Sequence, residues 1–238
     1  MRDLLRTCSR DFGPGSRRLF ALCAATLLPA AIGCGSTPGG DGGDAVEVAV
    51  TINKNLERGQ KLMDAARADW NMHDPAENES GLNKLLEAEE LFFEARKLSP
   101  NSSKPRIALG NCRSLIGYVY YSQYEKFEGQ RLAAVESGDS PPRRVVERRD
   151  EARTAAEEWL GKANRELEFY VRFLIGQFPN PFVYEQLATN YEYLGQYGAA
   201  EQMLRVFMQN VQLTGARRKE FEARAKALRE KRLDEFEG

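Results

Sequence analysis

The sequence predicts an all-α fold made of helix pairs, and three observations support that prediction. After residue 50, apolar residues recur at steps of three and four, the spacing of one face of an α-helix. No stretch of this region alternates apolar and polar residues for long, as a half-buried strand would. Clusters of proline and glycine divide the region, so that each expected helix ends at a turn signal.

The first two helices are expected on either side of a loop that contains Pro75 and Gly81 and cannot be helical throughout. The apolar line of the first helix follows steps of four and three, at Ile52, Leu56, Gly59, Met63, Ala66 and Trp70. The second helix continues this pattern at Leu85, Ala88, Phe92 and Ala95 and stops before Pro100.

The third and fourth helices are long. Ser102 or Ser103 can cap the third, with Pro105 in its first turn, and its apolar line is Ala108, Cys112, Leu115 and Val119. The segment 137–142 breaks the chain, and Ser140 can cap a fourth helix over about 141–177. Such a helix is about 55 Å long at a rise of about 1.5 Å per residue.

Three shorter helices are expected over 181–194, 197–212 and 216–236. The last of them is dense in Arg, Lys and Glu. A helix that polar usually covers the exposed end of a stack.

The segment from Pro181 to Thr214 resembles the 34-residue unit of tetratricopeptide (TPR) proteins. The matching residues are Tyr184, Leu187, Ala188, Tyr191, Ala200 and Leu204, with Gly195 and Tyr197 at the turn and Gln212 in place of the closing proline. Residues 85–100 match the second half of the motif, and Leu109-Gly110 matches the centre of a first helix. The resemblance implies a TPR-like domain over 49–238: a right-handed array of antiparallel helix pairs, with one elongated helical hairpin and a C-terminal capping helix.

Residues 1–33 have the parts of an export signal: a basic start, an apolar run of about 15 residues from Leu19 to Gly33, and small residues at the end. A plain membrane anchor is the alternative, although the run is short for the ~20 residues that span a bilayer. Ala31-Ile32-Gly33-Cys34 resembles the lipobox of bacterial lipoproteins. That resemblance implies cleavage before Cys34 and acyl chains on it, which would anchor the protein to a membrane.

Arg17 and Arg18 lie in a stretch that resembles the twin-arginine export motif, although adjacent arginines also occur by chance in basic leaders. The general secretory and twin-arginine routes therefore both stay open. Residues 34–48 are mostly Gly, Ser, Thr, Pro and Asp at their start, which predicts a flexible linker after the lipidated cysteine. Gly35 and Ser36 follow Cys34, and the lack of an Asp there weakly favours the outer over the inner membrane.

TPR arrays bind peptides or helices along the concave face formed by the first helix of each pair. The resemblance places Phe182, Glu185, Gln186, Thr189, Glu192, Tyr193, Ile107, Asn111 and Ser114 on that face. Glu185 stands where chaperone-binding relatives have a lysine for a terminal carboxylate, so a neutral or basic partner is expected. The alternative is that these residues pack against the long hairpin.

Two further segments have two interpretations each. The aromatic residues between Tyr118 and Phe127 wrap much of a helix, so they are either buried between the long helices or form an exposed interface patch. The arginines at 143, 144, 148 and 149 lie near the expected hairpin tip, where they either meet anionic lipid or an acidic partner or form a solvated face among acidic neighbours.

Composition argues against several classes of function. The chain has 238 residues and a net charge of −1, which gives no general attraction to nucleic acid. His73 is the single histidine, and with four cysteines neither a zinc site nor a disulfide framework is expected. The sequence contains no phosphate-binding glycine loop, no nucleophile elbow and no pair of carboxylates with a cleft in which they could act. No enzyme activity, catalytic residue, cofactor, metal or small-molecule substrate is therefore expected.

The expected function is therefore that of an interaction protein. The sequence predicts a lipoprotein on the periplasmic side of a bacterial cell membrane or outer membrane, acting as an adaptor or assembly factor that holds a protein or peptide partner. The alternative is a structural subunit of an envelope complex that associates with copies of itself.

Overall fold

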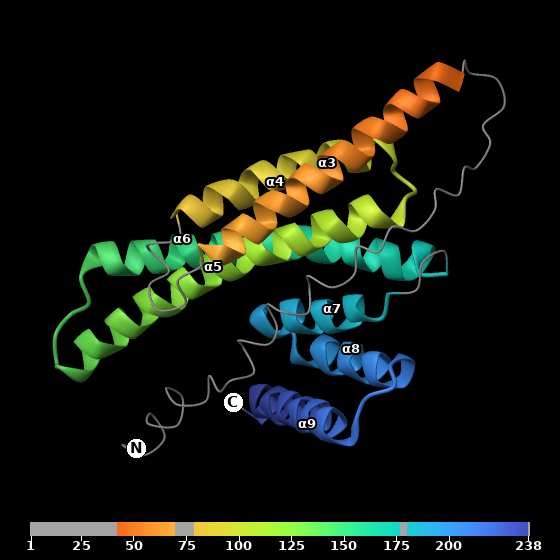
Figure 1. The fold of residues 1–238 in the computed structure, drawn as a ribbon. Coiled ribbons are helices and arrows are strands. Elements are labelled where there is room, and N and C mark those ends of the chain that lie inside the picture. The colour runs from red at the N-terminus through yellow and green to blue at the C-terminus, as the bar shows by residue number, and fades with distance from the viewer. Residues whose placement is uncertain (1–41, 70–78, 177–179, 238) are drawn as a thin grey trace. The chain divides into compact units, whose positions relative to one another are not determined.

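The computed structural model describes residues 42–69, 79–176 and 180–237, and all regular structure in these ranges is helical (Figure 1). The elements are α3 (Gly42–Ala68), α4 (Glu79–Leu98), α5 (Ser103–Glu136), α6 (Arg143–Phe169), the π-helix η2 (Tyr170–Leu174), α7 (Phe182–Tyr193), α8 (Tyr197–Asn210) and α9 (Gly215–Glu237). The all-α prediction is confirmed. From α4 onwards the expected breaks between helices fall where the described helices end.

Three helix starts differ from the expectation. Helix α4 begins at Glu79, so Gly81, which was expected in the loop, is a buried residue of its first turn. Helix α3 begins at Gly42, inside the range expected to be a flexible linker. The run from Ala45 to Val50 contains no Gly or Pro and includes good helix formers, so it continues the helix backwards; residues 34–41 lie outside the described residues. Helix α6 begins at Arg143 with Pro142 rather than Ser140 at the N-cap position, so the expected serine cap is wrong.

Helices α3 and α4 form an antiparallel pair (Figure 1). Gly59 lies so close to Phe92 that a Cβ atom there would be 2.6 Å from the Phe92 ring. Salt bridges flank this contact: Arg58 to Glu87 at 2.6 Å, and Lys84 to Asp69. The side chains of α3 are buried only from Leu56 onwards, so the described turns before Leu56 lack the close packing of the rest of the helix.

Helices α5 and α6 form the elongated hairpin, which reverses at a turn where Gly138 has a φ of 81°. Gly110 and Gly117, two turns apart on α5, let α6 approach closely. A Cβ atom at Gly110 would lie 2.5 Å from Leu167 Cδ2, and one at Gly117 would lie 2.7 Å from Leu160 Cδ2. The hairpin is therefore joined along a seam in which leucine side chains fill the space left by glycines.

The fourth helix was expected to continue to about residue 177, and the structure divides this stretch into α6 and η2. Tyr170, at the start of η2, is fully buried, and its hydroxyl accepts a hydrogen bond from the Asn180 backbone N–H at 2.8 Å. This contact fixes the chain as it leaves the hairpin towards α7.

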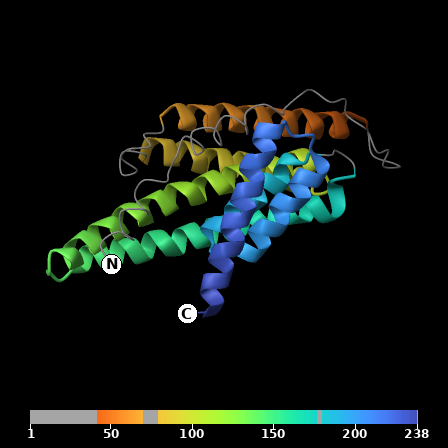
Figure 2. The same cartoon turned by 90° about the horizontal axis from the view of Figure 1, so that it is seen from below.

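Helices α7, α8 and α9 pack side by side after the hairpin (Figures 1 and 2). Their shared core contains Ala188, Ala200, Leu204, Phe207, Phe221, Ala225 and Leu228, with Tyr184 and Tyr191 packed against it. Gly195, in the α7–α8 turn, has a φ of 71°, a backbone conformation that favours glycine. Most residues that carry the resemblance to a tetratricopeptide unit thus lie in one packed cluster.

Candidate binding surfaces

Several residues of functional interest lie outside the described residues: Arg17, Arg18 and Cys34 of the expected leader and anchor, and His73. Across the ranges that the structure covers, none of the helices has the length and apolar character needed to cross a membrane. Within the same ranges, no cluster of three or more His, Cys, Asp or Glu residues is arranged to hold a metal ion.

Two of the expected groove residues, Ser114 on α5 and Gln186 on α7, belong to a polar network centred on Asn190, which is fully buried on α7. The Asn190 amide donates hydrogen bonds to Ser114 Oγ at 2.9 Å and to Asn164 Oδ1 at 2.8 Å. Its carbonyl accepts from the Tyr118 hydroxyl at 2.6 Å and from Gln186 at 3.3 Å. Ser114 and Gln186 therefore join α5 to α7 inside the chain.

Three further groove residues face α9 instead. Arg224 donates to Thr189 Oγ1 at 3.0 Å and forms a salt bridge with Glu192 at 2.8 Å. Glu185 is 7% exposed and lies 3.9 Å from Arg217. Burial raises the pKa of Glu185, while the charges of Arg217 and Arg224 act in the opposite direction. The acidic face that was expected to favour a neutral or basic partner thus meets the arginines of the chain's own last helix.

The other four groove residues are partly exposed: Ile107, Asn111, Phe182 and Tyr193. Phe182 contacts Phe207, with ring centroids 5.8 Å apart. Tyr193 contacts the hairpin, with its ring 4.8 Å from that of Tyr118 and 4.5 Å from that of Tyr121. These four residues, with Glu192, are the members of the expected groove that keep surface for a partner.

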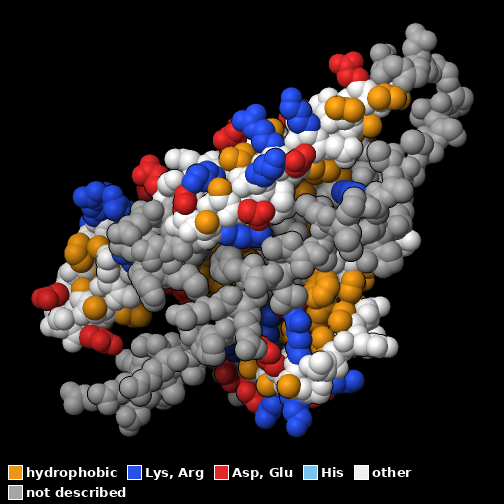
Figure 3. Space-filling model, viewed as in Figure 1, with side chains coloured by type: hydrophobic (Ala, Val, Ile, Leu, Met, Phe, Trp, Pro, Cys, Tyr) orange, Lys and Arg blue, Asp and Glu red, His pale blue; other side chains and the backbone are white. Residues whose placement is uncertain are grey.

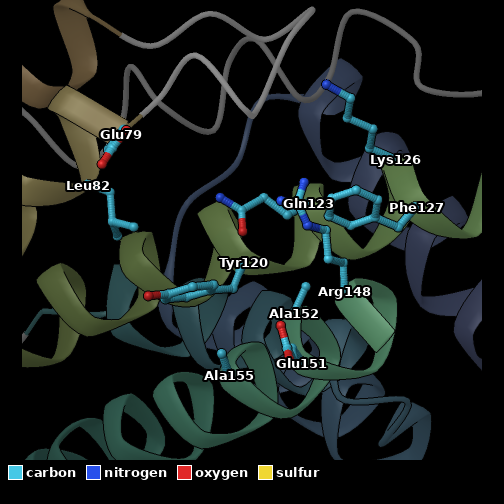
Figure 4. Close-up of a pocket in the computed structure, with 10 residues that line it drawn as sticks. All are labelled: Glu79, Leu82, Tyr120, Gln123, Lys126, Phe127, Arg148, Glu151, Ala152 and Ala155. Atoms are coloured by element: carbon cyan, nitrogen blue, oxygen red, sulfur yellow. The ribbon is translucent and has the colours of Figure 1, made fainter. Parts of the chain in front are cut away.

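The aromatic segment of α5 divides between two sides of the helix. Tyr118 and Tyr121 stack on Tyr193, as packing between helices requires. Tyr120 and Phe127 lie on another side and line a pocket between α4, α5 and α6 (Figure 4). Neither interpretation holds in full, because all the aromatic residues of the segment are half-buried and two of them contact α7 rather than the other long helix.

The pocket has a volume of about 460 Å³, within the range of ~300–1,000 Å³ that is usual for ligand sites. Its lining consists of Glu79, Leu82, Tyr120, Gln123, Lys126, Phe127, Arg148, Glu151, Ala152 and Ala155. Figure 4 shows Tyr120 and Phe127 on α5 opposite Ala152 and Ala155 on α6, with Arg148 near Phe127. The Arg148 guanidinium lies 5.9 Å from the centre of the Phe127 ring. The pocket was not predicted from the sequence, because it lies where the first turn of α4 meets the α5–α6 hairpin, and the hairpin continues beyond the start of α4.

A buried ion network, also missed from the sequence, ties α4, α5 and α6 together. Glu166 on α6 is 2.7 Å from Arg106, 3.4 Å from Arg113 and 3.5 Å from Arg96. Arg113 also forms a salt bridge with Glu89 at 2.7 Å. Arg106 donates to the Pro100 carbonyl, lies over the Phe169 ring at 3.6 Å, and has a pKa lowered by burial against the opposing effect of Glu166. These residues give α4 a fixed position on the hairpin.

Two single features have plain structural roles. Cys112 is fully buried, and its thiol donates a hydrogen bond to the Leu85 carbonyl at 3.3 Å. Burial raises its pKa, so the thiol stays protonated and unreactive near neutral pH.

At the hairpin tip, Arg143 pairs with Glu147 at 2.7 Å and Arg149 pairs with Asp150 at 2.6 Å, in keeping with a solvated face.

Comparison with known proteins adds no relative: no family model, no curated protein and no solved structure matches this chain.

Proposed function

We propose that the protein is a membrane-anchored periplasmic lipoprotein that acts as a TPR-type adaptor or assembly factor in a bacterial envelope. The observation that carries this proposal is the lipobox-like segment that ends at Cys34, followed by a chain that folds into helix pairs. An anchor and a helical interaction domain on one chain are the two parts that such an adaptor needs.

The packing of α7, α8 and α9 supports the repeat part of the proposal. The small residues Ala188 and Ala200 are fully buried, which lets α7 and α8 cross closely, and Leu204 and Phe207 fill the space around them. Stacked helix pairs of this kind present extended faces to which partner helices or peptides bind.

The proposed partner surface is the partly exposed set Ile107, Asn111, Phe182, Glu192 and Tyr193. It combines two aromatic rings, one aliphatic side chain and an amide, a composition suited to a protein partner. Because Glu192 already pairs with Arg224, the surface favours a largely neutral partner.

The anchor is tested by fractionation of cells that produce the native chain, Cys34→Ala or the control Cys23→Ala, which removes a thiol from the apolar run instead. We expect the native chain and the control in membranes, and the Cys34→Ala chain uncleaved or released. Unchanged processing and location of Cys34→Ala would refute the lipid anchor.

The adaptor role is tested by affinity capture from detergent-solubilised envelopes with the native chain, Asn111→Arg and the control Glu158→Arg, which alters an exposed position on α6. We expect one envelope protein to co-purify with the native chain and the control, and to be lost with Asn111→Arg. A partner retained equally by all three chains would move the binding surface elsewhere, and the absence of any specific partner would refute the adaptor role.

A further inference from the structure

An aromatic cluster joins the middle of α5 to the end of α7. The Tyr121 and Tyr193 rings lie 4.5 Å apart, centre to centre, and their planes meet at 63°. Tyr118 also contacts Tyr193, with ring centres 4.8 Å apart. Both Tyr121 and Tyr193 are half-buried, so part of each side chain reaches solvent. The two rings therefore form an edge-to-face corner, the Tyr121–Tyr193 corner, rather than a closed stack.

Glu125 lies beside this corner. It follows Tyr121 by four residues on α5, so the two side chains lie on the same face of the helix. Burial raises the pKa of Tyr121 and of Tyr193, and the charge of Glu125 is the second cause of both shifts. The Glu125 carboxylate is therefore close enough to act on both rings of the corner.

No arginine or lysine of the described chain forms an ion pair with Glu125, which keeps an exposed surface. Loss of water around its carboxyl raises the pKa of Glu125, and no neighbouring charge opposes that shift. Glu185 differs in this respect, because Arg217 and Arg224 oppose the effect of burial there. A carboxylate that has lost water without gaining a partner is stabilised when a cation approaches it.

An arginine of the same chain shows how a ring and a carboxylate hold one cation together. Arg106 lies 3.6 Å from the centre of the Phe169 ring and pairs with Glu166 at 2.7 Å. A planar guanidinium can do both, because its faces stack on rings while its N–H groups point outwards to a carboxylate. Among the described residues no cation lies over the ring of Tyr121 or Tyr193. The Tyr121–Tyr193 corner and Glu125 thus repeat this arrangement without its arginine.

The charges elsewhere on the surface do not favour one sign. Basic and acidic side chains are interspersed along α3 and over α9 (Figure 3). Lys231, near the end of α9, lies 5.4 Å from the centre of the Tyr197 ring and 3.8 Å from Glu192, so a ring and a carboxylate already hold it. A cationic group of a partner is therefore selected by a single site with an unmatched charge, rather than by a broad field of one sign.

We propose that the partner of this chain inserts an arginine side chain at the Tyr121–Tyr193 corner, with its guanidinium over the rings and against Glu125. This inference rests on the proposed adaptor function, because Tyr193 belongs to the proposed partner surface, and it adds the chemistry of one partner residue. Glu192 of that surface is already paired with Arg224. A largely neutral partner segment that carries one arginine therefore fits the surface and the corner together.

The first test is a titration of the purified chain with Cys34→Ala, labelled with fluorotyrosine and followed by fluorine NMR. The probe is Nα-acetyl-arginine amide, and the neutral control is Nα-acetyl-citrulline amide, which has a similar shape without the charge. Tyr121→Phe and Tyr193→Phe assign the two resonances. We expect the arginine probe to shift both resonances and the citrulline probe to shift neither.

The same titration tests the carboxylate. We expect Glu125→Gln to weaken binding of the arginine probe at least about fivefold. The matched control Glu136→Gln alters an exposed acid further along α5 and should leave binding unchanged. Equal shifts with both probes, no shift with either, or equal affinities of the two variants would overturn the proposal. Tighter binding to Lys231→Ala would also overturn it, because the chain's own lysine would then fill the site.

The second test repeats the affinity capture from envelopes with Glu125→Gln and Glu136→Gln. We expect the envelope protein whose capture depends on Asn111 to be captured at least about fivefold less by Glu125→Gln only, and to be released by the arginine probe but not by the citrulline probe. Capture that depends on Asn111 but not on Glu125 would leave the adaptor role intact and refute the arginine. Successful titration without any captured protein would assign the site to a free organic cation and refute a partner's arginine.

Discussion

Replacement of Glu166 by glutamine should destabilise the protein more than any surface charge removal on the same helix. Glu166 and Arg106 have side chains that are 8% and 7% exposed and lie 2.7 Å apart. The substitution keeps the size of the side chain and removes its charge. Arg113 would keep Glu89, but Arg106 would face a neutral amide in place of its carboxylate, and its other contacts, a backbone carbonyl and the Phe169 ring, carry no charge.

The expected loss follows from the cost of a buried charge without its partner. Breaking a buried pair from one side costs about 3–5 kcal/mol, and the remaining contacts of Arg106 favour the lower end, about 3 kcal/mol. That is a large share of the ~5–15 kcal/mol by which proteins are usually stable. For a folded region of this size it corresponds to a fall in Tm of about 6–12 °C.

The measurement is thermal and urea unfolding followed by circular dichroism at the helical signal. The matched control is Glu157→Gln, which removes an exposed ion pair with Arg153 on the same helix and should cost less than about 1 kcal/mol. If Glu166→Gln unfolds at the same urea concentration as the control, the network does not hold α4 on the hairpin as we infer. The pair-replacing variant Arg106→Met with Glu166→Leu should lose less than Glu166→Gln alone.

Three further predictions test other parts of the fold. Gly110→Ala should lower the free energy of unfolding by about 1–3 kcal/mol, because the new Cβ atom would meet Leu167. Gly129→Ala, where nothing lies within 4 Å of the new Cβ atom, should raise it by about 0.5–1 kcal/mol, and equal effects of the two variants in urea unfolding would contradict the close seam. Glu185→Gln should raise the Tm at pH 7, because burial raises the pKa of Glu185 and ionisation of this carboxyl in the folded state therefore opposes folding. The gain in Tm should vanish at pH values below the unfolded pKa near 4.5, and a gain that persists at pH 3.5 would refute that cause. Cys112 should react with a thiol reagent only at the rate of opening, because burial raises its pKa; rapid labelling of the folded chain would show that its burial is wrong.

Local sequence signals were sufficient for most of the helices. Pro100 and the 137–142 segment mark breaks between the described helices, and Pro105 lies in the first turn of α5 as expected, because proline and glycine restrict the backbone regardless of distant packing. The apolar lines of α4 and α5 were also read correctly: Leu85, Ala88, Phe92 and Ala95 are all nearly or fully buried. Periodicity succeeds there because one face of each helix is covered along most of its length.

The surfaces were harder to predict than the helices. Whether Gln186 and Thr189 face a partner or the chain's own helices depends on Asn190 and Arg224, and neither pairing has a local sequence signal. The pocket beside Tyr120 depends on where α4 begins relative to the hairpin, which is a property of the assembled fold. Likewise, Arg106 and Glu166 are 60 residues apart in the chain, and nothing near either residue indicates that they pair.

The outer half of the hairpin differs from the rest of the folded chain in how it can open. No residue from Tyr120 to Glu151 is buried, while the seam at Gly110 and Gly117 lies in the inner half. Segments with few buried contacts exchange their amide hydrogens through local opening, without unfolding of the core. The outer half can therefore bend or fray when it meets another surface, while the network around Glu166 and Asn190 keeps its geometry. A contact with another molecule at this end can therefore change the structure of the outer half without changing the free energy of unfolding of the rest of the domain.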